Sequence, residues 1–95
     1  MVIFEYHNLT FTKSYSGDLL VIRGEMTNRS IRNYSAVAIR VILFDKDMQI
    51  ANIVIVVNGV PAGRTKQFEK EVKELGYDRN VSRITRYEAY TESAY

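Results

Sequence analysis

In residues 36–45 large apolar side chains occupy every second position, and this period of two constrains the fold more than any other feature of the chain. These positions are Val37, Ile39, Val41 and Leu43. Alternate residues of an extended strand point to the same side, whereas a helix would scatter these four around its axis. The segment therefore predicts a β-strand with one face in the core.

Further strands are predicted wherever β-prone segments alternate in the same way and end at turn residues. They cover residues 2–13, as one bent strand or two short ones, and residues 19–28, 49–57, 64–72 and 81–91. Val2 begins the first of these segments, and Ser14, Ser16, Gly17 and Asp18 form the turn after it. Residues 64–76 also fit a helical spacing that ends at Gly76, and we favour the strand.

Two segments indicate which side chains point inward. On residues 19–28 we expect an inner face and an opposite outer face; the inner face is Leu20, Ile22, Gly24 and Met26, and the outer face is Arg23, Glu25 and Thr27. Asp45, Lys46, Asp47 and Met48 predict a hairpin turn. If Phe44 pairs with Gln49, Leu43 lies opposite Ile50 and Ile39 lies opposite Val54.

Six or seven mainly antiparallel strands without long helices predict an all-β fold, an immunoglobulin-like two-sheet sandwich. The 95 residues fit a single domain over 1–95. Hydrophobic residues make up 46% and charged residues 25%, close to the averages of folded proteins, and the net charge of +2 is too small to require a nucleic-acid partner. The chain has no cysteine, which excludes disulfides and cysteine metal sites.

Three short motifs add a resemblance to a known family. They are Gly24-Glu25-Met26-Thr27-Asn28, then Val41-Ile42-Leu43-Phe44-Asp45, then Pro61-Ala62-Gly63 leading to Phe68. Together they resemble the FxLYD domain family over roughly residues 19–87. The chain departs from the family pattern where Val41 replaces its first Phe, Phe44 replaces its Tyr and Met48 replaces a turn glycine. The resemblance implies an immunoglobulin-like sandwich of prokaryotic proteins that are often extracytoplasmic, with no established activity.

No combination of side chains predicts catalysis, a metal site or a cofactor, so we do not expect an enzyme. His7 is the only histidine, and no orienting carboxylate or nucleophile is evident beside it. Asp45 and Asp47 lack the spacing, glycine and closing glutamate of a calcium loop. The glutamates and lysines of residues 66–74 are typical of a solvated strand face.

The C-terminal segment interleaves basic and aromatic residues, which is the basis of an alternative function. Arg83, Arg86 and Tyr87 are the candidate ligand patch, with Tyr77, Arg79 and Tyr90 nearby. Such a mixture can hold carbohydrate or single-stranded nucleic acid by stacking and charge. Tyr87 and Tyr90 should face opposite sides of one strand, which weakens this reading. Asn8, Asn28, Asn33 and Asn80 each open an Asn-x-Ser/Thr triplet, which turn chemistry explains as well as glycosylation does.

The favoured function is a non-catalytic interaction or spacer module whose partner is a protein, either a second copy or a neighbouring domain. With the hairpin register above, one sheet face carries Ala38, Ile42, Phe44, Ala51, Ile53 and Ile55. Its main polar residues are Arg40 and Gln49. A weak homodimer or docking surface is expected there, with Ile42, Phe44, Ile53 and Ile55 as candidate interface residues. The alternative is that the chain's own first or last strand covers this face, or that a bulge shifts its members.

No signal peptide or membrane insertion is expected. The longest apolar run, residues 53–57, is far shorter than the roughly 20 residues of a membrane helix. The compartment stays open, and the resemblance implies an extracytoplasmic one if the chain is part of a longer family member.

Overall fold

The computed structural model describes residues 3–15 and 17–95, in which six strands and two short helical turns occur. The strands are β1 (Phe4–Lys13), β2 (Leu19–Asn28), β3 (Tyr34–Asp45), β4 (Met48–Val60), β5 (Thr65–Gly76) and β6 (Arg86–Ala94); the helical turns are α1 (Tyr77–Asn80) and η1 (Val81–Arg83). Val2 and Ser16, expected in the first strand and the first turn, lie outside the described residues. No helix of the described segments is long and apolar enough to cross a bilayer.

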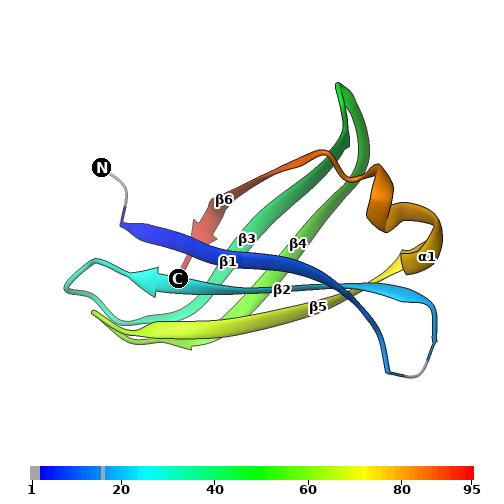
Figure 1. The fold of residues 1–95 in the computed structure, drawn as a ribbon. Coiled ribbons are helices and arrows are strands. Elements are labelled where there is room, and N and C mark those ends of the chain that lie inside the picture. Colours follow the sequence, from blue (N-terminus) through cyan, green and yellow to red (C-terminus); the bar gives the residue numbers. More distant parts are fainter. Residues whose placement is uncertain (1–2, 16) are drawn as a thin grey trace.

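The strands form two antiparallel three-stranded sheets that pack face to face. The first sheet has the order β1-β2-β5 and the second has the order β4-β3-β6. Figure 1 shows the first sheet crossing in front of the second, with α1 and η1 at one end. The predicted all-β two-sheet sandwich is therefore confirmed, with six strands.

The core lies between the sheets and contains both of the predicted apolar stripes. On the first sheet Leu20, Ile22 and Met26 are fully buried, and on the second sheet Val37, Ile39, Val41 and Leu43 are fully buried. Burying one such side chain stabilises the fold by roughly 1.5 to 3 kcal/mol relative to leaving it in water. These two central strands thus account for much of the apolar burial.

Gly24 occupies an inner position of β2, where the neighbouring side chains leave room only for a glycine. A Cβ added at Gly24 would lie 2.7 Å from Cζ of Phe68 and 2.9 Å from Cδ1 of Leu9. The Phe68 ring of β5 and the Leu9 side chain of β1 therefore occupy the space in front of this glycine. The inner position predicted for Gly24 is confirmed.

The first segment is one bent strand and not two short ones. The pairing of β1 with β2 shifts between His7 and Thr10, and Asn8 has a positive φ of 54°. Asparagine tolerates this left-handed conformation better than most residues, so the strand bends at Asn8 without ending.

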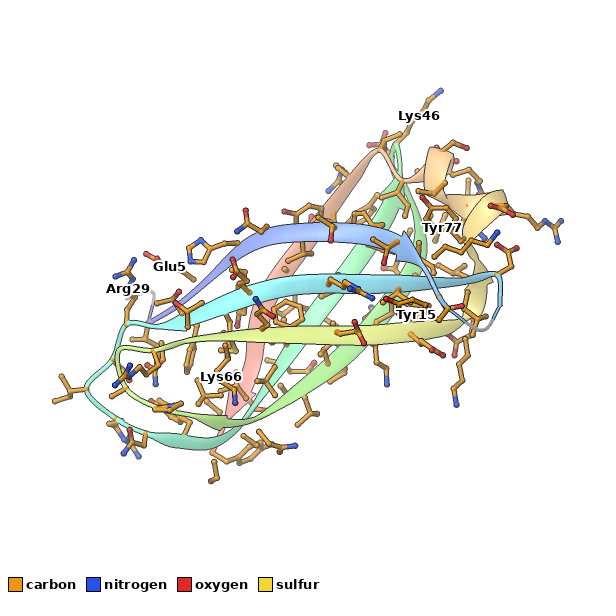
Figure 2. All side chains as sticks on the ribbon, turned by 60° about the horizontal axis from the view of Figure 1, so that its bottom comes forward. Glu5, Tyr15, Arg29, Lys46, Lys66 and Tyr77 are labelled. Atoms are coloured by element: carbon orange, nitrogen blue, oxygen red, sulfur yellow. The ribbon has the colours of Figure 1, made fainter. Side chains whose placement is uncertain are left out.

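The predicted hairpin register is right at the turn and wrong beyond it. Phe44 pairs with Gln49, but Leu43 pairs with Ala51 and Ile39 pairs with Ile55, because a bulge adds one residue to β4. Without the bulge Asn52 would face the core, where an amide without partners is costly. With it, Asn52 lies outside and accepts a hydrogen bond from Nη1 of Arg40 at 2.7 Å. Figure 2 shows Lys46 at the tip of this hairpin.

Two other boundaries differ from the prediction. Strand β4 continues through Asn58 and Gly59 to Val60, since Gly59 accepts a positive φ of 65°. The last predicted strand begins at Arg86, not at residue 81, because residues 77–83 form α1 and η1. The start of α1 is tied to the β1–β2 loop, where the Tyr77 and Asp78 amides donate to the carbonyl and side chain of Asp18. The strand favoured for residues 64–76 is confirmed as β5.

Candidate functional site

The two outer faces of the sandwich differ in polarity. On the first sheet the outward positions are almost entirely polar, the exception being the buried Val21. They are Glu5, His7, Thr10, Thr12, Arg23, Glu25, Thr27, Thr65, Gln67, Glu69 and Glu71. Such a face is suited to water. Figure 2 shows Glu5 beside Arg29 at one end of this sheet, where they form an ion pair of 2.9 Å.

On the second sheet the outward positions include many apolar side chains. The apolar members are Ala36, Ala38, Ile42, Phe44, Val54, Val56 and Tyr90. Ala38 is buried, whereas Val56 is 58% exposed and Tyr90 is 47% exposed, and none of the seven belongs to the core cluster. We call this surface the outer face of the second sheet, and it is the candidate functional site.

The structure keeps two of the four predicted interface residues on this face. Ile42 and Phe44 of β3 lie on it, half-buried. Ile53 and Ile55 do not, because the β4 bulge turns them inward: Ile55 is only 3% exposed and Ile53 packs against the core. Ala51 is turned inward in the same way. Val54 and Val56 lie on the outer face in their place. The polar Asn52 was the one signal in the sequence that the inner and outer positions of β4 are exchanged.

A polar network at the centre of the outer face neutralises its charges. The Arg40 guanidinium donates to Oδ1 of Asn52 at 2.7 Å and, through Nε, to Oε1 of Glu92 at 3.0 Å. Arg40 also forms an ion pair with Glu92 through Nη2. The guanidinium is therefore already partnered, and the residues directly opposite Arg40 on the neighbouring strands, Val54 and Tyr90, are apolar or aromatic.

The candidate ligand patch is divided among three places. Arg83 lies in η1 and pairs with Asp45 at 3.3 Å. Arg86 stacks on Phe44, with its guanidinium carbon 3.8 Å from the ring centroid, and pairs with Glu88 at 3.0 Å. Tyr87 shares the inner parity of β6 and packs edge-on against Phe11 of β1, with centroids 6.0 Å apart. Tyr90 faces the other side of the strand, as predicted, so the aromatic rings form no common stacking platform.

His7 lies on the polar outer face of the first sheet among hydroxyl groups. Its Nε2 is 3.2 Å from Oγ1 of Thr27 and 3.7 Å from Oε1 of Glu5. Oγ1 of Thr27 is in turn 2.8 Å from Oγ1 of Thr65. Within residues 3–15 and 17–95 no three His, Cys, Asp or Glu side chains gather as metal ligands. Asp45 pairs with Met48 across a two-residue turn of Lys46 and Asp47, so the hairpin prediction is confirmed.

A groove that the sequence did not predict lies between the free edges of β1 and β6. It has a volume of about 810 Å³ and apolar walls that include Ile3, Phe4, Ala89 and Ala94. Tyr6 and Thr91 also line it, and their side-chain hydroxyls hydrogen-bond to each other. Burial raises the pKa of the Tyr6 hydroxyl, and the hydrogen bond to Thr91 partly opposes this. Both residues look like ordinary strand residues in the sequence, so only the pairing of distant strands could reveal the groove.

The four Asn-x-Ser/Thr triplets occupy different environments. Asn8 and Asn33 are exposed, whereas Asn28 and Asn80 are buried. Nδ2 of Asn28 donates to the carbonyls of Arg32 and Val60, and its Oδ1 accepts from the amide and hydroxyl of Ser30. Nδ2 of Asn80 donates to the Gly76 carbonyl. The turn interpretation therefore accounts for these two asparagines.

In comparisons with protein-family models, curated proteins and solved structures, nothing matches this chain. The resemblance to the FxLYD family stays a prediction.

Proposed function

We propose that this chain is a non-catalytic interaction module of the immunoglobulin-like kind, which docks a partner protein on the outer face of the second sheet. The contrast between the two outer faces carries this proposal. Both faces belong to sheets of equal size, yet one is polar while the other exposes Val56, Tyr90 and the edges of Ile42 and Phe44. A contiguous apolar surface on a small protein is typical of an interface.

The chemistry of the face fits a protein better than a charged ligand. Protein interfaces are rich in aromatic and aliphatic residues at the centre, and Arg is among the residues enriched there. Here Arg40 and Arg86 lie on the face with their charges paired to Glu92 and Glu88, so neither is free to hold a phosphate. The alternative of a carbohydrate or nucleic-acid module relies on Arg83, Arg86 and Tyr87, and their separation favours the protein partner.

Site-specific photo-crosslinking in the native host tests the proposal. A benzophenone side chain in place of Tyr90 puts the probe on the outer face of the second sheet, and the same probe in place of Gln67 puts it on the first. Both positions are exposed on strands at a sheet edge, so they form a matched pair. We expect adducts with another protein from position 90 and none from position 67. The same adducts should disappear when Ile42→Lys is added to the probe at position 90.

Two results would contradict the proposal. Adducts of equal yield from both positions would mean that the contrast between the faces does not guide binding. Adducts at position 90 that persist in the Ile42→Lys background, with an unchanged urea midpoint, would mean that the apolar face is not the contact.

A further inference from the structure

Strand β4 is an edge strand, and none of its side chains carries a charge that would oppose pairing with another strand. It pairs only with β3, at one end of the order β4-β3-β6. In the part of the chain that the structure describes, its backbone has one further partner, the Asn28 side-chain amide on the Val60 carbonyl at 3.2 Å. The remaining outward N–H and C=O groups are left as a template for another strand.

The other three edges carry charges, which is a common protection against edge pairing. Strand β1 has Glu5 and Lys13, and β6 has Arg86, Glu88 and Glu92. Strand β5 has Lys66 and Lys70 on its inner parity, opposite Met26 and Ile22. Inward charges of this kind oppose edge pairing. By contrast, β4 has 13 residues, from Met48 to Val60, without one charged side chain.

The sequence of β4 is nearly the same in both directions. Residues 52–58 read Asn-Ile-Val-Ile-Val-Val-Asn, with Ile55 at the centre. If a second β4 approaches antiparallel around a two-fold axis at Ile55, residues whose numbers add to 110 face each other. Asn52 then meets Asn58, Ile53 meets Val57, and Val54 meets Val56. Each side chain meets one of its own chemical class, as an isologous interface requires.

The alternative registers lose this match. A shift by two residues sets Asn52 against Val56 or Asn58 against Val54. A shift by one residue sets the outer face of one copy beside the inner face of the other. In the central register Asn52 still has its amide hydrogens to donate, because its Oδ1 accepts from Arg40. The flanking groove of β4 and β5 contains Lys70, Glu71, Lys73 and Glu74, whose charges cancel.

We infer that two copies of this chain dimerise through β4, with antiparallel pairing centred on Ile55. The product is one continuous six-stranded sheet in the order β6-β3-β4-β4-β3-β6. The outer faces of the two second sheets lie on the same side of it. This goes beyond the proposed function, since it uses the β4 edge and a second copy, and either can fail without the other.

Sedimentation equilibrium of the purified chain tests the dimer. We expect a reversible monomer–dimer equilibrium at concentrations up to about 1 mM. Val56→Lys puts a charge on the exposed outer side of the edge, and it should weaken dimerisation by about tenfold or more because two Val54–Val56 pairs are lost. Gln67→Lys on the β5 edge is the matched control and should leave the equilibrium unchanged. Urea midpoints of both variants should stay close to wild type, because both side chains are exposed.

Disulfide crosslinking tests the register with side chains that differ little in size. The chain has no cysteine of its own. Val54→Cys and Val56→Cys should form a covalent dimer when mixed, because residues 54 and 56 face each other. Each variant alone should crosslink poorly, since equal residues lie diagonally, about 7 to 8 Å apart.

Any of three results would overturn the inference. They are a strictly monomeric wild type at about 1 mM, equal weakening by Val56→Lys and Gln67→Lys, and crosslinking of each cysteine variant with itself as fast as in the mixture. Adducts from the photo-probe at position 90 to a different protein would still support the proposed function in each case.

Discussion

The side-chain hydroxyls of Tyr6 and Thr91 hydrogen-bond to each other across the gap between the two sheets. Tyr6 belongs to β1 and Thr91 to β6, so this contact joins the two free edges along the groove that both residues line. Both residues are half-buried. The bond therefore links the layers at the side of the sandwich that their backbones leave open.

Removing the tyrosine hydroxyl should change how stability depends on alkaline pH. Burial raises the pKa of Tyr6 above its ordinary value of 10.0, so the native state holds the phenolic proton more tightly than the unfolded state does. This contribution is complete below pH 10 and is lost as the pH rises through the higher native pKa. Tyr6→Phe should be less stable by roughly 0.5 to 1.5 kcal/mol at pH 8. The deficit in urea melts should shrink above pH 10, and a deficit that widens there would contradict this account.

Shortening a core side chain of β3 should cost far more than removing a surface charge of β2. Leu43 is fully buried, so Leu43→Ala loses transfer energy and leaves a cavity, at a cost of roughly 2 to 5 kcal/mol. Arg23 is exposed and forms a 3.0 Å ion pair with Glu69, a kind of contact worth at most about 1 kcal/mol. Urea unfolding of Leu43→Ala and Arg23→Ala should give clearly different midpoints. Similar midpoints would mean that the inner and outer faces are assigned the wrong way round.

Adding one methyl group at Gly24 should strain the contact between β2 and β5. The new Cβ would lie 2.7 Å from Cζ of Phe68, so either the ring or the strand must move. Gly24→Ala should therefore destabilise the domain by about 1 to 3 kcal/mol. Phe68→Leu removes the obstructing ring atoms, so the double variant should be less destabilised than the sum of the two single changes. Strict additivity in urea melts would mean that the ring does not cause the strain.

The parts of the fold that local alternation controls could be predicted from the sequence. The stripes of β2 and β3 are clear because every member of each stripe apart from Gly24 is a large apolar residue, whereas the outer positions between them include Arg23, Glu25 and Arg40. In β4 residues 53–57 are all β-branched, so parity carries little information there and only Asn52 indicates which face is outside. The bulge that satisfies Asn52 depends on Arg40, a partner on another strand. The candidate interface residues Ile53 and Ile55 were misplaced for this reason.

Contacts between distant segments explain what else the sequence did not reveal. Residues 77–83 turn helical where their first amides bind Asp18, some sixty residues earlier in the chain. Arg86 looks like a free cation in the sequence, yet β3 and β6 pair so that it stacks on Phe44. Ile42 and Phe44 were placed correctly because β3 is the central strand of its sheet, and its inner stripe leaves them outside.

Replacing Asn28 by a carboxylate should be among the most damaging isosteric changes in the chain. The Asn28 side chain is fully buried at the end of β2, where its Nδ2 donates to the carbonyls of Arg32 and Val60. In Asn28→Asp both donors become an acceptor that faces those two carbonyl oxygens, and a buried charge without a counterion is added. We expect a cost of roughly 3 to 5 kcal/mol at pH 7. Burial and the carbonyls raise the native pKa of the new carboxyl, so the cost should fall at pH 4, where the proton returns.

Asn33→Asp is the control, because this exposed residue uses only its Oδ1, which accepts from the Ala62 amide at 2.9 Å, and aspartate keeps that acceptor. Urea midpoints at pH 7 and pH 4 should show a large, pH-dependent difference between the two variants. A cost of Asn28→Asp that equals the control, or that grows on acidification, would mean that the buried amide does not hold this end of the sandwich together.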